Sequence, residues 1–376
     1  MFVFEEYISP ISETEIAGLD PRSDVSPTST YYALKDLRNQ LRAAERNALV
    51  DEEGISSLSR DWLPLLEQCS NAIKTESKDI EYLAWFIEGL CRVYSFKGLA
   101  FGFKIAHNLL NKYFNELYPS LDDDDEVSDK VSALVGLNGS AGEGTLIIPI
   151  KSIYLTDSAS MESYSFWEYQ QGYDISRLND EKREKKLSSG AVDYELIERS
   201  AAETSTEFFV TLKQDIEEAM QQFSLLSEVL DQVTGQPQPT SNIKKALEVS
   251  LSAVNHIAAD KFAALEQAKL EAEAEAEVLL EAELIKSDGE LGTTIAAKKQ
   301  GSLEIDSRES AINKLKEIAA FFRKTEPHSP MSYTIEQVIR WSELSLPELL
   351  NELITDSDAR TGYFKLSGIK ISETET

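Results

Sequence analysis

Apolar residues recur at spacings of three and four between residues 77 and 119, which is the pattern of helices with a buried face. The pattern breaks near Gly98, so we predict two helices that form a hairpin. Aromatic side chains such as Tyr82 and Phe96 lie on the remaining faces. Other helices must therefore cover the hairpin on more than one side. Its predicted core residues are Leu83, Trp85, Phe86 and Leu90.

The chain before the hairpin has a different pattern. Residues 7–30 contain three prolines and many Ser, Thr and Asp, which favour turns and discourage helix, so we predict an ordered lead-in segment. From Tyr31 the spacing becomes helical, and Thr30 can cap the start of this helix. A second helix is expected around residues 62–74. The basic residues of the first helix are predicted to form a charged side opposite its apolar one; they are Lys35, Arg38, Arg42 and Arg46.

Behind the hairpin, irregular and helical stretches alternate. A glycine-rich segment predicts a flexible loop before LIIPIKSIYL (residues 146–155), whose central proline predicts an extended packing strand rather than a helix. Residues 158–190 are predicted to be irregular and anchored to the core by their aromatic side chains. Helical spacing resumes over residues 192–233, and Gly235 is expected to end this helix.

A long helix is predicted to start near Ile243. Its first half carries an apolar seam that can pack against a partner helix. Its second half alternates Ala and Glu, which are good helix formers and poor strand formers, so we expect helix in spite of the period of two. Residues 286–305 lose all periodicity and are rich in Gly, Ser, Thr and Lys, which predicts a flexible tether.

The last part of the chain is predicted to be a small unit of three helices. Capping residues punctuate it: Asp306 opens the first helix, Thr334 with Gln337 the second, and Ser345 the third. A unit of only three helices has a small core. Burying apolar groups such as Trp341 against copies of itself would therefore add much to its stability.

These patterns together predict an all-α protein. The expected parts are a multi-helix N-terminal domain built on the hairpin (1–175), a helical middle region with a long acidic helix (190–285), a linker (286–305) and a helical C-terminal oligomerisation domain (306–370).

Charge limits the partners that the chain can take. Its 376 residues include 37 basic and 66 acidic ones, a formal net charge of −29 that repels phosphate backbones and anionic lipid head groups. We therefore expect neither nucleic acid binding nor direct membrane insertion. Two cysteines suit a reducing cytosol, and the sequence has neither a basic leader region nor a charge-free run of about 18 residues. These observations predict a cytoplasmic protein.

Motifs that could carry chemistry fail on their spacing. As a calcium loop, the acidic run at residues 122–126 would need Gly and Glu where the chain has Val127 and Ala133. The cluster GSAGEGT (139–145) has the glycine spacing of a phosphate loop but lacks its lysine. The three histidines lie in separate segments without metal-ligand spacing. We expect no enzymatic activity, no cofactor and no metal.

One further alternative concerns residues 158–190, where aromatic residues neighbour the basic run DEKREKK. Such a combination can stack on the bases of a single strand. The acidic residues nearby and the net charge of the chain disfavour that interpretation.

Six stretches carry a family resemblance, among them SKDIEYLAWFIEGL, YPSLDDDDE, GLNGSAGEGTLIIPIKS and FFRKTEPHSP. They occupy residues 19–46, 77–102, 118–126, 136–157, 164–171 and 321–341. In this order they resemble the TssA (ImpA-type) subunits of bacterial type VI secretion systems, in particular the shorter form. Around residues 270–305 no motif matches, so the separation between core and C-terminal unit is left open.

The resemblance implies a cytoplasmic, non-enzymatic assembly protein that oligomerises and helps to build a contractile injection machine. Its family partners are the baseplate proteins, the Hcp tube, the VgrG spike, the sheath subunits and the membrane complex. The TEPHSP segment resembles that of the baseplate-associated form. The acidic surface and the long helix also fit an alternative, a monomeric adaptor or chaperone for secreted effectors.

Candidate contact residues lie in the C-terminal unit. Arg323 is expected near a helix end, where a cation suits the helix dipole, and two prolines hold His328 in a fixed turn beside Glu326. With Trp341, these are the candidate oligomer or partner contacts. The same turn could equally be an intramolecular connector. A ring formed through this unit is implied by the resemblance.

Overall fold

A computed structural model describes residues 2–51, 54–122, 126–272, 308–325, 331–344 and 349. The chain divides into two compact units, Met1–Lys286 and Ser287–Thr376. Within the described residues every regular element is a helix, and extended pairing is limited to three isolated bridges. The predicted all-α fold is confirmed.

The helices of the first unit follow one another with short connections. They are α1 (Phe4–Ile8), α2 (Thr30–Val50), the 3₁₀ helix η1 (Ile55–Trp62), α3 (Leu63–Thr75), α4 (Ile80–Tyr113), α5 (Val127–Lys130), α6 (Ser132–Asn138), α7 (Ile147–Lys151), α8 (Phe166–Ser176), α9 (Asp180–Ser188), α10 (Tyr194–Glu203), α11 (Thr206–Thr234) and α12 (Ser241–Ile257). Residues 259–272 continue as helix after Ala258.

The central hairpin is α4. Its helical backbone is broken at Ser95, with φ 55° and ψ −143°, three residues before the predicted break. A Cβ atom at Gly102 would lie 2.8 Å from Cγ1 of Ile87, so the two arms run back along each other. The arms are also in close contact at Gly98, because a Cβ there would collide with the carbonyl oxygen of Leu90. The sequence signal at Gly98 thus reports the close approach, and Ser95 makes the turn.

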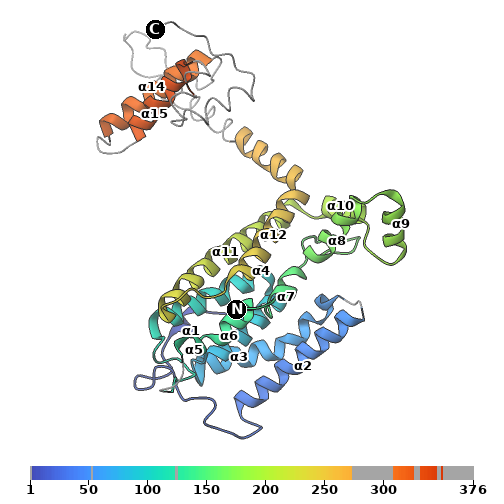
Figure 1. The fold of residues 1–376 in the computed structure, drawn as a ribbon, viewed down its shortest axis with the longest axis vertical. Coiled ribbons are helices and arrows are strands. Elements are labelled where there is room, and N and C mark those ends of the chain that lie inside the picture. Colours follow the sequence, from blue (N-terminus) through green and yellow to red (C-terminus); the bar gives the residue numbers. More distant parts are fainter. Residues whose placement is uncertain are drawn as a thin grey trace, which may run out of the picture. The chain divides into compact units, whose positions relative to one another are not determined.

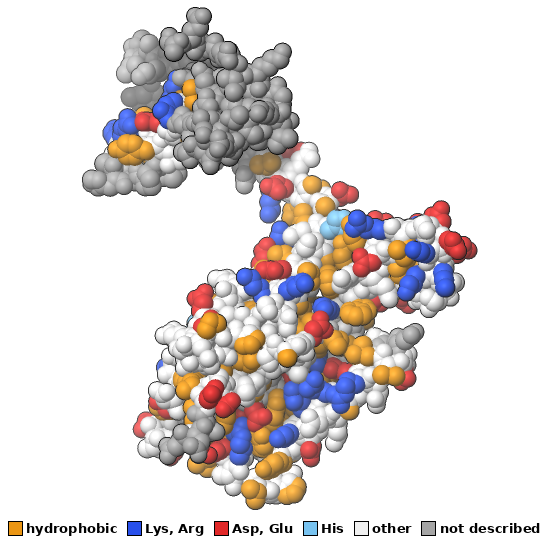
Figure 2. Space-filling model, viewed as in Figure 1, with side chains coloured by type: hydrophobic (Ala, Val, Ile, Leu, Met, Phe, Trp, Pro, Cys, Tyr) orange, Lys and Arg blue, Asp and Glu red, His pale blue; other side chains and the backbone are white. Residues whose placement is uncertain are grey.

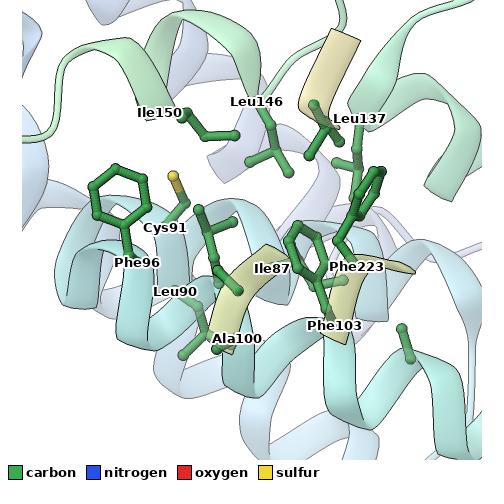
Figure 3. Packing of buried hydrophobic residues seen from close by; sticks show 14 of the residues in the cluster. Ile87, Leu90, Cys91, Phe96, Ala100, Phe103, Leu137, Leu146, Ile150 and Phe223 are labelled. Atoms are coloured by element: carbon green, nitrogen blue, oxygen red, sulfur yellow. The ribbon is translucent and has the colours of Figure 1, made fainter. Parts of the chain in front are cut away.

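The core surrounds the hairpin on several sides. Leu83, Trp85, Phe86 and Leu90 are at most 3% exposed. Helix α11 lies along α4, α12 lies along α11, and α3 packs on α4 as well (Figure 1). Figure 3 shows side chains of the hairpin facing those of α6, α7 and α11; the labelled ones include Ile87, Phe103, Leu137, Ile150 and Phe223. The predicted boundary between residues 1–175 and 190–285 falls inside this shared core.

Two expectations for the segment behind the hairpin are wrong. The predicted strand is helix α7, because Pro149 falls in its first turn, where no backbone donor is needed. The predicted irregular segment forms α8 and α9. Ser165 caps α8 through the amide of Glu168, and Asn179 caps α9, which are polar signals that the aromatic content obscured.

The glycine-rich loop is held in place by hydrogen bonds, in contrast to the flexible loop that was expected. The Gly144 amide donates to the carbonyl of Asn138 at 2.9 Å. The side chain of Asn138 accepts from the Ile243 amide at 2.9 Å, and Asn242 donates back to the carbonyl oxygens of Asn138 and Gly142. The loop therefore fixes the start of α12 to the end of α6.

One helix end follows the sequence expectation closely. The prediction that Gly235 ends the preceding helix is confirmed, since it takes a left-handed conformation (φ 69°) behind α11. The predicted helix at 192–233 is interrupted, however, because Thr204 and Ser205 lie between α10 and α11 and Ser205 caps the latter. Residues 7–30 are ordered as predicted and pair with the hairpin base through the bridge between Gly18 and Ser77.

The second unit contains α14 (Arg308–Thr325) and α15 (Met331–Glu343), which pack on each other. Helix α15 begins at Met331, so Thr334 and Gln337 lie inside it and the predicted cap at that position is wrong. The predicted cap at Asp306, the tether at 286–305 and the start of a third helix at Ser345 lie outside the described residues.

Candidate functional site

Two of the predicted contact residues, Arg323 and Trp341, lie within the described residues. The guanidinium of Arg323, near the end of α14, lies 2.6 Å from the Glu336 carboxylate of α15 and 5.8 Å from the ring centre of Tyr333. Arg323 therefore connects the two helices within the unit. Trp341 is half-buried on α15. Glu326 and His328 lie outside the described residues, so their roles stay predictions.

A groove lies between the two C-terminal helices. Its volume is about 410 Å³, and Ala319 and Ile339 line it together with basic side chains of α14. Apolar groups are exposed elsewhere on the same two helices: Ile318 is 45%, Val338 43% and Tyr333 64% exposed. Large apolar side chains at this density on a small helix pair are typical of a surface that is covered in an assembly.

The base of the hairpin is fixed by an ionic cluster around the buried Asp79. Asp79 caps α4 by accepting from the amides of Glu81 and Tyr82. Arg22 of the lead-in segment lies 2.7 Å from the Asp79 carboxylate and 2.5 Å from that of Glu81. Burial raises the pKa of Asp79 to about 6, and Arg22 limits that rise. This cluster explains why a proline-rich segment is ordered.

Lys78, next to this cluster, is only 1% exposed. Its Nζ donates to the carbonyl oxygens of Tyr7 and Ile73, both at 2.8 Å. Burial lowers the pKa of Lys78 to about 8. The ammonium group therefore closes the end of α3 and holds α1 to it.

Two arginine–glutamate pairs connect α2 to the hairpin. Arg38 binds the fully buried Glu88 through both Nε and Nη2, and Arg92 binds Glu45 at 2.5 and 2.9 Å. Burial disfavours the charged Glu88 carboxylate, but Arg38 and Arg92 keep its pKa below the usual value. Arg92 also lies 3.7 Å above the ring of Trp62.

The sequence pattern does not predict these pairs, because it places Arg38 on a charged side opposite the apolar one. One signal could have revealed them. Glu88 stands in the otherwise apolar run WFIEGLC on a helix predicted to be covered all round, so its carboxylate needed a buried cation. The nearest basic row in the sequence was that of α2.

A cleft opens where the hairpin turns. It has a volume of about 330 Å³ and lies between η1, the turn of α4 and the residues after α7. Its lining is mixed, with the apolar Ile55 and Ile153, the hydroxyls of Ser59 and Ser95, and the guanidinium of Arg60.

The described part of the chain shows neither a metal-holding cluster nor an exposed cysteine. No group of three His, Cys, Asp or Glu there could hold a metal ion. Both cysteines are buried, and burial raises the pKa of Cys91 to about 12, so its thiol is a poor nucleophile. The site chemistry found here is that of ionic anchoring and surface contact.

Comparison with known proteins identifies the N-terminal region. Residues 8–139 match the family model described as ImpA, N-terminal, type VI secretion system. They contain the lead-in segment, α2, α3 and the hairpin. The resemblance predicted from the sequence motifs is confirmed for these residues, which are similar to the ImpA N-terminal region.

A solved structure shares the fold. It is the N-terminal domain, including the conserved ImpA_N region, of the TssA component of the type VI secretion system from Burkholderia cenocepacia. The two align with a TM-score of 0.56 at 18% identity, over 69% of this chain and 94% of the other. A search of curated proteins gave no match. Among the described residues, no helix is long and apolar enough to cross a membrane.

Proposed function

We propose that this chain is a non-enzymatic assembly component of a bacterial type VI secretion machine, acting in the cytoplasm as an oligomeric scaffold. The observation that carries the proposal is the match of residues 8–139 to the ImpA N-terminal model, together with the shared fold of the TssA domain. The scaffold coordinates the baseplate with assembly of the tail tube and sheath. Its partners are the baseplate proteins, the Hcp tube, the VgrG spike, the sheath and the membrane complex.

The two units have different parts in this proposal. The first unit is a body with a large hydrophobic core and ionic anchors, which suits a rigid docking platform. The second unit exposes Ile318, Val338 and Tyr333, and these apolar groups support oligomerisation, as a ring of copies through α14 and α15.

Multi-angle light scattering of the full chain tests the oligomer. We expect a mass that is a multiple of the 42.0 kDa chain. Replacing Ile318→Asp and Val338→Asp together should shift the mass to that of the monomer, because each carboxylate would be desolvated at the interface. The matched control is Val25→Asp on the first unit, where the side chain is 78% exposed, and it should leave the mass unchanged.

Pull-down with purified secretion subunits tests the function. The full chain should retain baseplate, tube or sheath proteins. A monomeric full chain that bound only secreted effectors would instead support the adaptor or chaperone alternative and would reject the scaffold.

A further inference from the structure

Basic side chains form a row along α2 in a chain that is strongly acidic overall. Lys35, Arg38, Arg42 and Arg46 follow one another at spacings of three and four, which places them along one side of the helix. Figure 2 shows Lys and Arg side chains gathered over the part of the surface that α2 and its neighbours occupy in Figure 1. The chain has a formal charge of −29, so a face with a local excess of positive charge differs from the charge of the chain as a whole.

Members of this row have different partners. Arg38 is used internally by Glu88. Within the described part of the chain, the side chains of Arg42, Arg46 and Arg60 form no ion pair with a carboxylate. Arg42 and Arg46 lie on α2, and Arg60 lies on η1. All three guanidinium groups can donate hydrogen bonds to a carboxylate of another molecule.

Arg42 is the most informative of them because it is half-buried without a partner. Burial lowers the pKa of its guanidinium, and three nearby arginines lower it further, while Glu88 opposes the shift. Those arginines are Arg38, Arg46 and Arg92. Desolvation of an unpaired cation among like charges is unfavourable, and a carboxylate supplied by a partner would relieve it.

The cleft at the hairpin turn lies next to the row. Glu45, one turn beyond Arg42 on α2, lines the cleft and is already neutralised by Arg92. Arg60 lines this opening of about 330 Å³ from η1, and Arg42 lies outside the lining, one turn before Glu45 on α2. The apolar lining, from Ile55 and Ile153, gives room for one large apolar side chain.

We propose that this face binds an acidic segment of a partner protein, with carboxylates on Arg42 and Arg60 and an apolar side chain in the cleft that Arg60 lines. The argument is charge complementarity. Most of the surface of an acidic chain repels an acidic segment, which makes the arginine face the favoured place of contact and fixes its register. Nucleic acid carries one phosphate charge per nucleotide and would be repelled along its length by the rest of the chain.

Selection from a random 12-residue peptide library displayed on phage, against the full chain, tests this proposal. We expect the selected peptides to be enriched in Asp and Glu around one large apolar residue. A selected peptide, labelled with fluorescein, then gives the Kd by anisotropy. Arg42→Gln with Arg60→Gln should weaken that Kd at least tenfold.

The control removes the same charge elsewhere. Lys185→Gln with Lys186→Gln changes two exposed lysines of α9 and should leave the Kd within twofold. Circular dichroism confirms that both double variants are folded. Peptides without acidic enrichment, equal weakening by both double variants, or equally tight binding of a labelled 12-nucleotide single strand would each overturn the proposal.

Discussion

At the scale of single residues, the buried charges of the hairpin are the features on which its stability most depends. In the Arg38–Glu88 pair the Glu88 side chain is fully buried and the Arg38 side chain is 17% exposed. A pair in this position adds little compared with apolar groups of the same shape, but removing one partner leaves a buried charge uncompensated. The two glutamates of the α2 interface are therefore far more sensitive to substitution than the many acidic residues on the surface.

Glu88→Gln should lower the free energy of unfolding by about 3 kcal/mol, because Arg38 then stays desolvated without a countercharge. Urea denaturation followed by circular dichroism measures this. Glu143→Gln is the matched control, since Glu143 pairs with Lys151 while 55% exposed, and it should cost less than about 1 kcal/mol. Equal effects of the two substitutions would contradict the burial of the Arg38–Glu88 pair.

Lys78 gives a pH dependence of defined sign. Its pKa in the folded chain is about 8, against 10.5 for an unperturbed lysine, so between these values the unfolded chain binds more protons. The free energy of unfolding should then rise by about 2 kcal/mol between pH 7.5 and pH 9.5. Urea titrations at both pH values measure the rise, and a reference variant, Lys78→Met, should show none of it. A fall in stability over this range in the parent alone would reject the assignment.

At the scale of elements, the sequence predicted periodicity well and predicted polar contacts poorly. The hairpin, α2, α3 and the end of α11 at Gly235 follow from apolar spacing and one glycine. Pro149 and the aromatic content of residues 158–190 misled because the same residues suit a first helical turn or a capped short helix. The pairing of Arg38 with Glu88 depends on contacts between residues 50 positions apart, which no local pattern contains.

The candidate contact site was less predictable still. Arg323 and Trp341 were chosen for residue type and position, and the structure gives Arg323 an intramolecular partner in Glu336. The arginine face on α2 was visible as a basic row. Only the geometry, however, separates Arg38, which is internally paired, from Arg42, which is not.

Two glycines allow a sharp test of the hairpin geometry. Gly98→Ala should destabilise the chain by about 1 to 3 kcal/mol, because the new methyl group collides with backbone of the opposite arm. Gly136→Ala, in α6, meets nothing within 4 Å and should be neutral or stabilising by up to about 1 kcal/mol. Thermal and urea unfolding measure the change in stability of both variants. A Gly98→Ala variant as stable as the parent would mean that the arms lie further apart than described.

At the scale of the whole molecule, the hydrophobic core defines which fragments can fold. The connected core runs from Tyr7 to Ala258 and lies entirely in the first unit. A fragment of residues 1–286 should therefore fold, with the same helix content that these residues have in the full chain, and should unfold cooperatively. A fragment of residues 1–175 lacks α11 and should aggregate, since the face of α4 that holds Phe103 is left uncovered. Circular dichroism and light scattering of both fragments measure this, and a folded, monomeric 1–175 fragment would show that α11 is dispensable.

The packing of α11 on the hairpin also determines when the hairpin can be covered during synthesis of the chain. The ring centres of Phe103 and Phe223 lie 5.0 Å apart although 120 residues separate them in the sequence. At a translation rate of about 5 to 20 residues per second, the face of α4 that holds Phe103 stays exposed for roughly 6 to 24 seconds before Phe223 of α11 is synthesised. During that interval the nascent chain presents a wide apolar surface to chaperones and proteases. Ribosome pausing before α11 is complete should therefore lower the yield of this protein more than the same pause after it.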